Sequence, residues 1–261
     1  MLYFKETESV YFMNDFGYFD SLMKNFAKVN ETQGENIKKA AKLMADAIEQ
    51  DRLISVYGGG GHTTLVMGEM FFRAGGLSNI NPIMETGLSV FNQALKYLEL
   101  ERTVNYGSAI MKYYDLKKDD VLIVFHNIGI NAATIDAVME AKKNGVKIIA
   151  VSSSFWQDEM PEDHFIRHPS KKNLFDFADV AIDDFNPVGD AAVQVPGFST
   201  PIAPVSNIID FYIAHLLEIE TVSQCVNRGI VPPVWSSANE PGGDQRNAAY
   251  LEKYKSRIKM L

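Results

Sequence analysis

Four short apolar runs constrain the fold of this chain more than any other feature of its sequence. They are rich in β-branched residues, are bounded by turn or helix signals, and cover residues 53–57, 121–125, 146–152 and 180–182. A strand with one wet face alternates apolar and polar residues, whereas these runs are apolar almost throughout. They therefore predict strands that are buried on both faces.

Helical patterns separate these runs. Apolar residues recur at helical spacing over residues 64–74, within 89–114 and over 131–144. The last pattern begins at Asn131, a residue type favoured at helix N-caps, and stops at Gly145. Strands that alternate with helices predict right-handed βαβ units. We therefore expect an α/β fold with a parallel sheet covered by helices.

Both ends of the chain predict further helices. Residues 14–29 and 37–48 have amphipathic spacing, and residues 206–228 predict a long helix, central or at a subunit contact, that is apolar nearly all round. The tail after Gly229 is rich in turn residues and ends in a charged helical segment over 248–259. We expect one structural domain, with N-terminal helices (1–50) packed on it or on a partner subunit, a central part (51–228) and a C-terminal extension (229–261).

The charge balance limits the partners of the chain. Its 261 residues carry 25 Lys and Arg against 33 Asp and Glu, a net charge of −8 that repels nucleic acid and anionic membrane surfaces. The single cysteine, Cys225, rules out an internal disulfide framework and is typical of a reducing compartment. The first 20 residues lack a signal-peptide pattern, and no uncharged apolar stretch reaches the roughly 18 residues that span a bilayer. We expect a cytoplasmic protein that binds neither nucleic acid nor membranes.

The first candidate site is the glycine-rich loop 58–64, between a predicted strand and a predicted helix. In a parallel sheet, ligands bind beyond the carboxyl ends of the strands. Consecutive glycines let the backbone approach an anion closely, and the loop fits neither the dinucleotide fingerprint nor a P-loop. It predicts an anion cradle, with a tight turn that binds nothing as the alternative. The candidate ligand-binding residues are Gly59, Gly61, His62 and Thr63.

Two more loops follow predicted strands. Loop 126–131 opens a helix and offers polar groups to a sugar or phosphate, although Ile128 and Ile130 favour a packed turn equally well. Three consecutive serines at 152–154 are able to hold a ligand or to cap a helix. The candidate ligand-binding residues here are His126, Asn127, Gly129, Asn131, Ser152, Ser153 and Ser154.

Residues 167–172 form the strongest local positive patch in this acidic chain. An anionic ligand needs such a patch, and an exposed basic loop without function is the alternative. The candidate ligand-binding residues are Arg167, His168, Ser170 and Lys172.

Acid–base chemistry needs a group whose pKa lies near neutrality, which favours histidine. The candidates are Glu69, His126 and His168, and the residues alone assign the catalytic role to none of them. Glu69 lies six residues after Thr63, about 9 Å along a helix. His215 lies in the most apolar helical pattern, where a hydrogen-bonded core histidine is the common explanation. The spacing of His, Cys, Asp and Glu matches no metal site, so we expect neither a metal nor a cofactor.

Several motifs together resemble a known family. They are YGGGGHT (57–63), EMFFRAGG (69–76), RHPS (167–170), PVGDAA (187–192), PPV (232–234) and SANEPGGD (237–244). The combination resembles the UPF0309 family of sugar isomerase (SIS) domain proteins. That resemblance implies a three-layer α-β-α fold with a five-stranded parallel sheet. It also implies a homodimer or dimer of dimers whose ligand sites lie near the subunit interface.

The resemblance also implies a ligand class. SIS domains bind phosphorylated sugars, and Thr63 falls where they have a phosphate-contacting Ser or Thr. In the second loop, His126 and Ile128 replace the two serines of the superfamily pattern. We therefore expect the protein to bind a phosphosugar. It would then either catalyse the aldose–ketose isomerisation of a sugar phosphate or amino-sugar phosphate, which is an intramolecular oxidoreductase reaction, or act as a non-catalytic sensor through a partner.

Overall fold

A five-stranded parallel sheet forms the centre of the protein. The computed structural model describes residues 14–261, and its sheet has the strand order β2-β1-β3-β4-β5. The four apolar runs became β1 (Ile54–Gly58), β3 (Val121–Phe125), β4 (Lys147–Ser152) and β5 (Val180–Asp183), as predicted. The edge strand β2 (Ile80–Pro82) was not predicted, because three residues that include Asn81 and Pro82 leave no strand signal.

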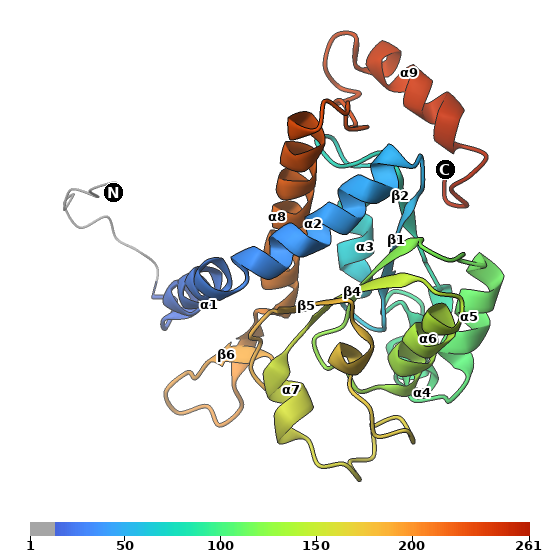
Figure 1. Ribbon diagram of the computed structural model, residues 1–261. Coiled ribbons are helices and arrows are strands. Elements are labelled where there is room, and N and C mark those ends of the chain that lie inside the picture. The colour runs from blue at the N-terminus through green and yellow to red at the C-terminus, as the bar shows by residue number, and fades with distance from the viewer. Residues whose placement is uncertain (1–13) are drawn as a thin grey trace, which may run out of the picture.

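Helices cover both faces of the sheet (Figure 1). One core cluster joins β1 and β3 to α2 (Gly34–Glu49), α3 (Thr64–Met70) and α8 (Ser206–Asn227). The other joins them to α5 (Tyr106–Tyr114) and α6 (Ala132–Lys143). The pleat of β3 divides its side chains, so that Val121, Ile123 and Phe125 face the first cluster while Leu122 and Val124 face the second. The three-layer α/β prediction is confirmed.

Several helix bounds differ from the sequence prediction. Residues 89–114, which follow the 3₁₀ turn η1 (Thr86–Leu88), form two helices, α4 (Ala94–Glu101) and α5. Asn105, with a φ of 72°, lies between these helices. Helix α3 ends at Met70 rather than at residue 74, because Phe71 is extended and Phe72 has a φ of 53°. The last helix, α9 (Gly243–Tyr254), begins and ends about five residues earlier than predicted. Helix α8 matches its prediction within one residue.

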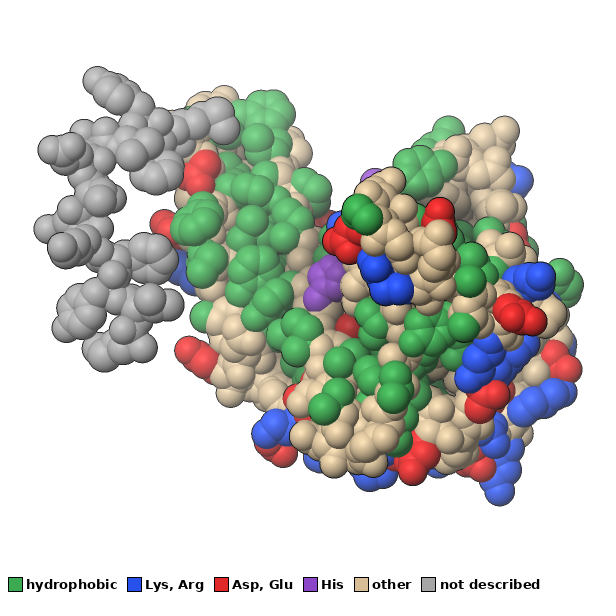
Figure 2. Space-filling model, turned by 90° about the horizontal axis from the view of Figure 1, so that it is seen from above, with side chains coloured by type: hydrophobic (Ala, Val, Ile, Leu, Met, Phe, Trp, Pro, Cys, Tyr) green, Lys and Arg blue, Asp and Glu red, His purple; other side chains and the backbone are tan. Residues whose placement is uncertain are grey.

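The remaining elements lie around the sheet. They are α1 (Tyr18–Thr32), α7 (Ser154–Glu159), η2 (Leu174–Phe177) and an antiparallel pair of β6 (Ala191–Val193) and β7 (Ile202–Pro204). On α1, Phe19 and Met23 are exposed, and Figure 2 shows apolar side chains gathered on this side of the molecule. This surface is consistent with the expected subunit contact, which stays a prediction.

The parallel sheet brings the three predicted loops to one edge. The chain leaves β1 for α3, β3 for α6 and β4 for α7, always at the carboxyl end of the strand. Backbone hydrogen bonds join the loops, since the Gly59 N–H donates to the Phe125 carbonyl and the His126 N–H donates to that of Val151. The fold thus places the loops side by side at the edge where α/β proteins bind ligands.

Candidate ligand-binding site

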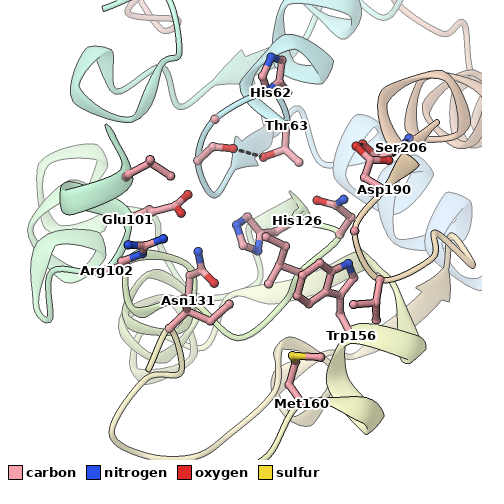
Figure 3. A pocket seen from close by; sticks show the side chains of 18 of the residues that line it. His62, Thr63, Glu101, Arg102, His126, Asn131, Trp156, Met160, Asp190 and Ser206 are labelled. Atoms are coloured by element: carbon pink, nitrogen blue, oxygen red, sulfur yellow. Dashed lines mark hydrogen bonds between the residues drawn. The ribbon is translucent and has the colours of Figure 1, made fainter. Parts of the chain in front are cut away.

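A cavity of about 590 Å³ opens at this edge of the sheet (Figure 3). The first and second loops supply part of its lining, as do α4, the chain between residues 156 and 166, and the start of α8. Among the predicted site residues, Gly61, His62, Thr63, His126, Asn127 and Asn131 line it.

The glycine loop presents backbone donors to this cavity. Within residues 14–261, the N–H groups of Gly60, His62 and Thr63 have no backbone acceptor. The hydroxyl of Thr63 donates to the Gly60 carbonyl at 2.7 Å, and that of Thr64 donates to Gly61 at the same distance. The threonine hydroxyls therefore stabilise the turn, and backbone N–H groups are the donors left for an anion.

His126 lies at the floor of the cavity as a neutral imidazole. Its Nδ1 accepts a hydrogen bond from the Gly129 N–H at 2.9 Å, so its proton resides on Nε2. Complete burial lowers the pKa of His126 to about 4. The side chain is thus a hydrogen-bond donor at neutral pH and not a cation.

Asn131 lines the same cavity with an unsatisfied side chain. It occupies the N-cap position of α6, as predicted, but its side chain makes no capping bond. The amide nitrogen and oxygen are both buried, and neither has a hydrogen-bond partner in the described part of the chain. A buried amide without partners is costly, so these two atoms mark a place for a polar ligand.

Glu101, at the end of α4, was not among the predicted site residues. It is only 6% exposed and lies over the glycine loop, since a Cβ on Gly60 would come within 2.7 Å of its Oε2. Burial raises the pKa of Glu101 to about 7, and the positive charge of the neighbouring Arg102 opposes this shift. The carboxyl group therefore titrates near neutrality, as a general base requires.

Arg102 supplies a positive charge to the cavity wall. Its guanidinium lies over the ring of Phe165, 5.2 Å from the ring centre. The sequence analysis missed both Glu101 and Arg102, because the charged pattern at the end of α4 is typical of a solvated helix face. Their position beside the glycine loop depends on tertiary packing, which the local sequence pattern does not reveal.

Other predicted residues lie nearby without lining the cavity. Gly59 packs against His126 and Thr134, and Gly129, with a φ of 67°, packs against Ser152. The hydroxyl of Ser152 donates to the His126 carbonyl at 2.7 Å, and that of Ser153 donates to the Asn186 carbonyl at 2.6 Å. Ser154 begins α7, and its N–H donates to the Asp183 carboxylate. These residues position the loops.

Arg167 and His168 of the predicted basic patch make hydrogen bonds within the protein. The guanidinium of Arg167 donates to the carbonyls of Gln157, Met160 and Pro161 and to the side chain of Asn173. His168 contacts Asp136 through Nε2 at 3.1 Å and Ser170 through Nδ1 at 2.7 Å. Lys172 is exposed, and none of the patch residues lines the cavity. The patch therefore forms no part of the proposed site.

Glu69 lies in a second cavity, of about 480 Å³, between α3 and α8. Its carboxylate contacts His215 Nε2 at 3.0 Å and Arg73 Nε at 2.9 Å. His215 Nδ1 in turn contacts Glu218 at 3.1 Å. His215 is 44% exposed on its side chain, so it is not the core histidine that its helical pattern favoured.

The described residues contain no group of three or more His, Cys, Asp and Glu side chains placed to hold a metal ion. The helices between residues 14 and 261 also include none that is long and apolar enough to cross a membrane.

Comparisons with known proteins agree with this architecture. The SIS domain family model matches residues 17–153. A UPF0309 protein of Thermoanaerobacter pseudethanolicus is 36% identical over 94% of this chain and 98% of its own length. One from Geobacillus kaustophilus is 32% identical over 94% of this chain and 95% of its own. Phosphoheptose isomerase from Neisseria gonorrhoeae has a similar fold, with a TM-score of 0.51 at 14% identity over 81% of this chain and 96% of that one.

Proposed function

The chain belongs to the UPF0309 family of SIS-domain proteins, and from this premise and the geometry of the main cavity we propose that it binds and isomerises a sugar phosphate. The observation that carries the proposal is Glu101, a buried carboxyl whose pKa of about 7 suits proton transfer and which faces the glycine loop. The similarity in fold to a phosphoheptose isomerase supports the ligand class.

In this proposal the phosphate binds at the glycine loop. The free N–H groups of Gly60, His62 and Thr63 are oriented dipoles of the kind that bind anions despite an acidic overall charge. Arg102 adds a positive charge to the wall of the same cavity. No serine hydroxyl of the second loop is needed, because these groups supply the donors.

Isomerisation moves one proton between two neighbouring carbons. The Glu101 carboxylate would remove the proton from the carbon beside the carbonyl, which gives an enediolate, and would return it to the former carbonyl carbon. The carbonyl oxygen gains a proton and the neighbouring hydroxyl loses one, so the reaction needs no added acid, base or oxidant. The Nε2–H of neutral His126 would donate to the oxygen on which negative charge develops.

Product analysis tests this function. The protein is incubated with a panel of aldose and ketose phosphates, and the isomers are separated and quantified, with Glu101→Gln as the matched variant. We expect one pair to interconvert at least about 10²-fold faster with wild-type protein than with the variant, while both proteins bind it. Tight binding without conversion would reject the isomerase and favour a sensing module, and no binding at all would reject the ligand class.

A further inference from the structure

Buried polar side chains gather where the chain leaves β5 and enters α8. Asp184 and Asn186 directly follow β5, Asp210 lies near the start of α8, and all three are 0% exposed. Asn207 lies three residues before Asp210 and therefore on the same side of the helix. Among the described residues, 14 buried side-chain atoms lack a hydrogen-bond partner, and six of them belong to these four residues. Five of the six are oxygens, so the group lacks donors or a cation.

The carboxyl groups of Asp184 and Asp210 have no positive partner. Burial raises the pKa of both groups, and the neighbouring Asp184 raises that of Asp210 further. One oxygen of Asp184 accepts from the Asn186 N–H at 2.9 Å, but its other oxygen and both oxygens of Asp210 have no partner within residues 14–261. Asp190 adds another negative charge that raises both pKa values. Two carboxylates buried in this way need protons or a cation to neutralise them.

The amide groups indicate a cation rather than protons. The Asn186 side chain lies beside the Asp184 carboxyl and lowers its pKa, yet its oxygen and nitrogen both lack partners in the described chain. The Oδ1 of Asn207 also lacks one there, and its Nδ2 donates to the His62 carbonyl at 3.2 Å. Two protons on the carboxyl groups satisfy at most two acceptors, whereas one hard cation takes six or more oxygen ligands. Five buried oxygens without donors therefore suit a cation better.

We propose that these four residues bind a hard divalent cation, Mg²⁺ or Ca²⁺. The ligands are the carboxylates of Asp184 and Asp210 and the side-chain oxygens of Asn186 and Asn207. Two carboxylates neutralise the charge of the ion, and carboxylate and amide oxygens are the ligands that both ions prefer. With only two carboxylates, the site differs from the clusters of three or more His, Cys, Asp and Glu that the described residues lack.

The ion site adjoins the main cavity. Asp190 and Ser206 line that cavity and lie side by side in Figure 3. The Asp190 carboxylate accepts from the Ser206 N–H at 2.8 Å and from its hydroxyl at 2.9 Å, which fixes the start of α8. The Ser153 hydroxyl donates to the Asn186 carbonyl at 2.6 Å. None of the four proposed ligands lines the cavity, so the ion stabilises its wall by joining β5 to α8 and does not touch the sugar.

Metal titration of the full chain tests the inference. Protein stripped with EDTA is titrated with Mg²⁺ and with Ca²⁺, and binding is followed by calorimetry and by Tm. We expect one ion per chain and a Tm increase of about 5 °C or more at roughly 100 times the Kd. The two titrations identify the ion, because Mg²⁺ requires octahedral ligands whereas Ca²⁺ accepts a less regular set.

The opposite result would assign protons to the two carboxyl groups. A group whose pKa is raised by folding stabilises the fold below that pKa, and this stabilisation is lost as the pH rises. No binding of either ion at millimolar concentrations, with a Tm that falls steadily as the pH rises, would therefore overturn the inference.

Two aspartate variants locate the ion. Asp210→Asn keeps the size of the side chain but removes a ligand charge, so it should abolish the Tm response to the ion. Because it also removes a buried charge, the variant should match or exceed the Tm of wild-type protein in EDTA. Asp244→Asn, which changes an exposed aspartate of α9, should retain the full response. An Asp210→Asn variant that binds the ion as tightly as wild-type protein would overturn the inference, because the ion would then bind elsewhere.

Discussion

The two cavities of this protein contain the same kinds of side chain and differ in how these are paired. In the second cavity, His215 is paired with Glu69 and Glu218, and Arg73 is paired with Glu69. In the main cavity, both amide atoms of Asn131 lack partners within the described chain, and Glu101 is buried with a raised pKa. Charged groups that satisfy one another stabilise a fold, whereas buried groups that lack partners await a ligand.

Substitution of one glutamate in each cavity should show the largest difference between the two cavities. Glu101→Gln should lower kcat/KM by about 10²–10⁴-fold, because it removes the proposed base. Glu69→Gln is the matched variant and should change kcat/KM by less than about threefold, since it alters a pair outside the main cavity. Initial rates with the substrate found in the panel check both values. Equal losses in the two variants would assign the chemistry to both cavities.

The glycine loop should be sensitive at one position and tolerant at another. A Cβ at Gly60 would displace the Glu101 carboxylate, and a misplacement of about 1 Å costs up to about 10²-fold, so Gly60→Ala should reduce kcat/KM by about 10–100-fold. Gly68, within α3, has open space around its Cβ position. Gly68→Ala should retain full activity and raise the free energy of unfolding by about 0.5–1 kcal/mol. Rates and urea denaturation of both variants provide the test.

The pH dependence should report Glu101. A base acts when it is deprotonated, so a pKa raised to about 7 means that kcat/KM reaches a plateau above pH 7. It should fall about tenfold for each pH unit below that value. The Glu101→Gln variant, measured between pH 5 and 9, should lose this dependence. A wild-type profile that is flat down to pH 5 would exclude Glu101 as the base.

His215 should affect stability and not binding. Its removal leaves Glu218, whose pKa burial already raises, with the Leu77 N–H as its main partner. We expect His215→Ala to destabilise the protein by about 1–2 kcal/mol, which lowers Tm by a few degrees. Ligand affinity should stay within about twofold. Lost binding with an unchanged Tm, measured by calorimetry, would place the second cavity in the ligand site.

The sequence predicted where the loops of the site lie better than it predicted which side chains act there. Apolar runs such as 121–125 identify buried strands, and parallel strands must bring their loops to one edge, so the positions of Thr63 and Asn131 followed from local pattern. The burial of Glu101 depends on how α4 packs against Gly60, which no local pattern encodes. Arg167 had the right charge for an anion, yet its hydrogen bonds are taken by neighbouring carbonyls. Residue type indicates what a group is able to bind, and packing decides what it binds.

Fluorescence of Trp156 tests the central claim most directly, because this residue lines the main cavity and the chain has only two tryptophans. The other, Trp235, packs against Phe72 and Tyr250 elsewhere, so Trp235→Phe leaves a single reporter. The account predicts that a sugar phosphate changes this fluorescence saturably, with the Kd found by calorimetry, and that Asn131→Ala weakens the response. Binding by calorimetry without any change at Trp156 would place the ligand outside the main cavity and contradict the account.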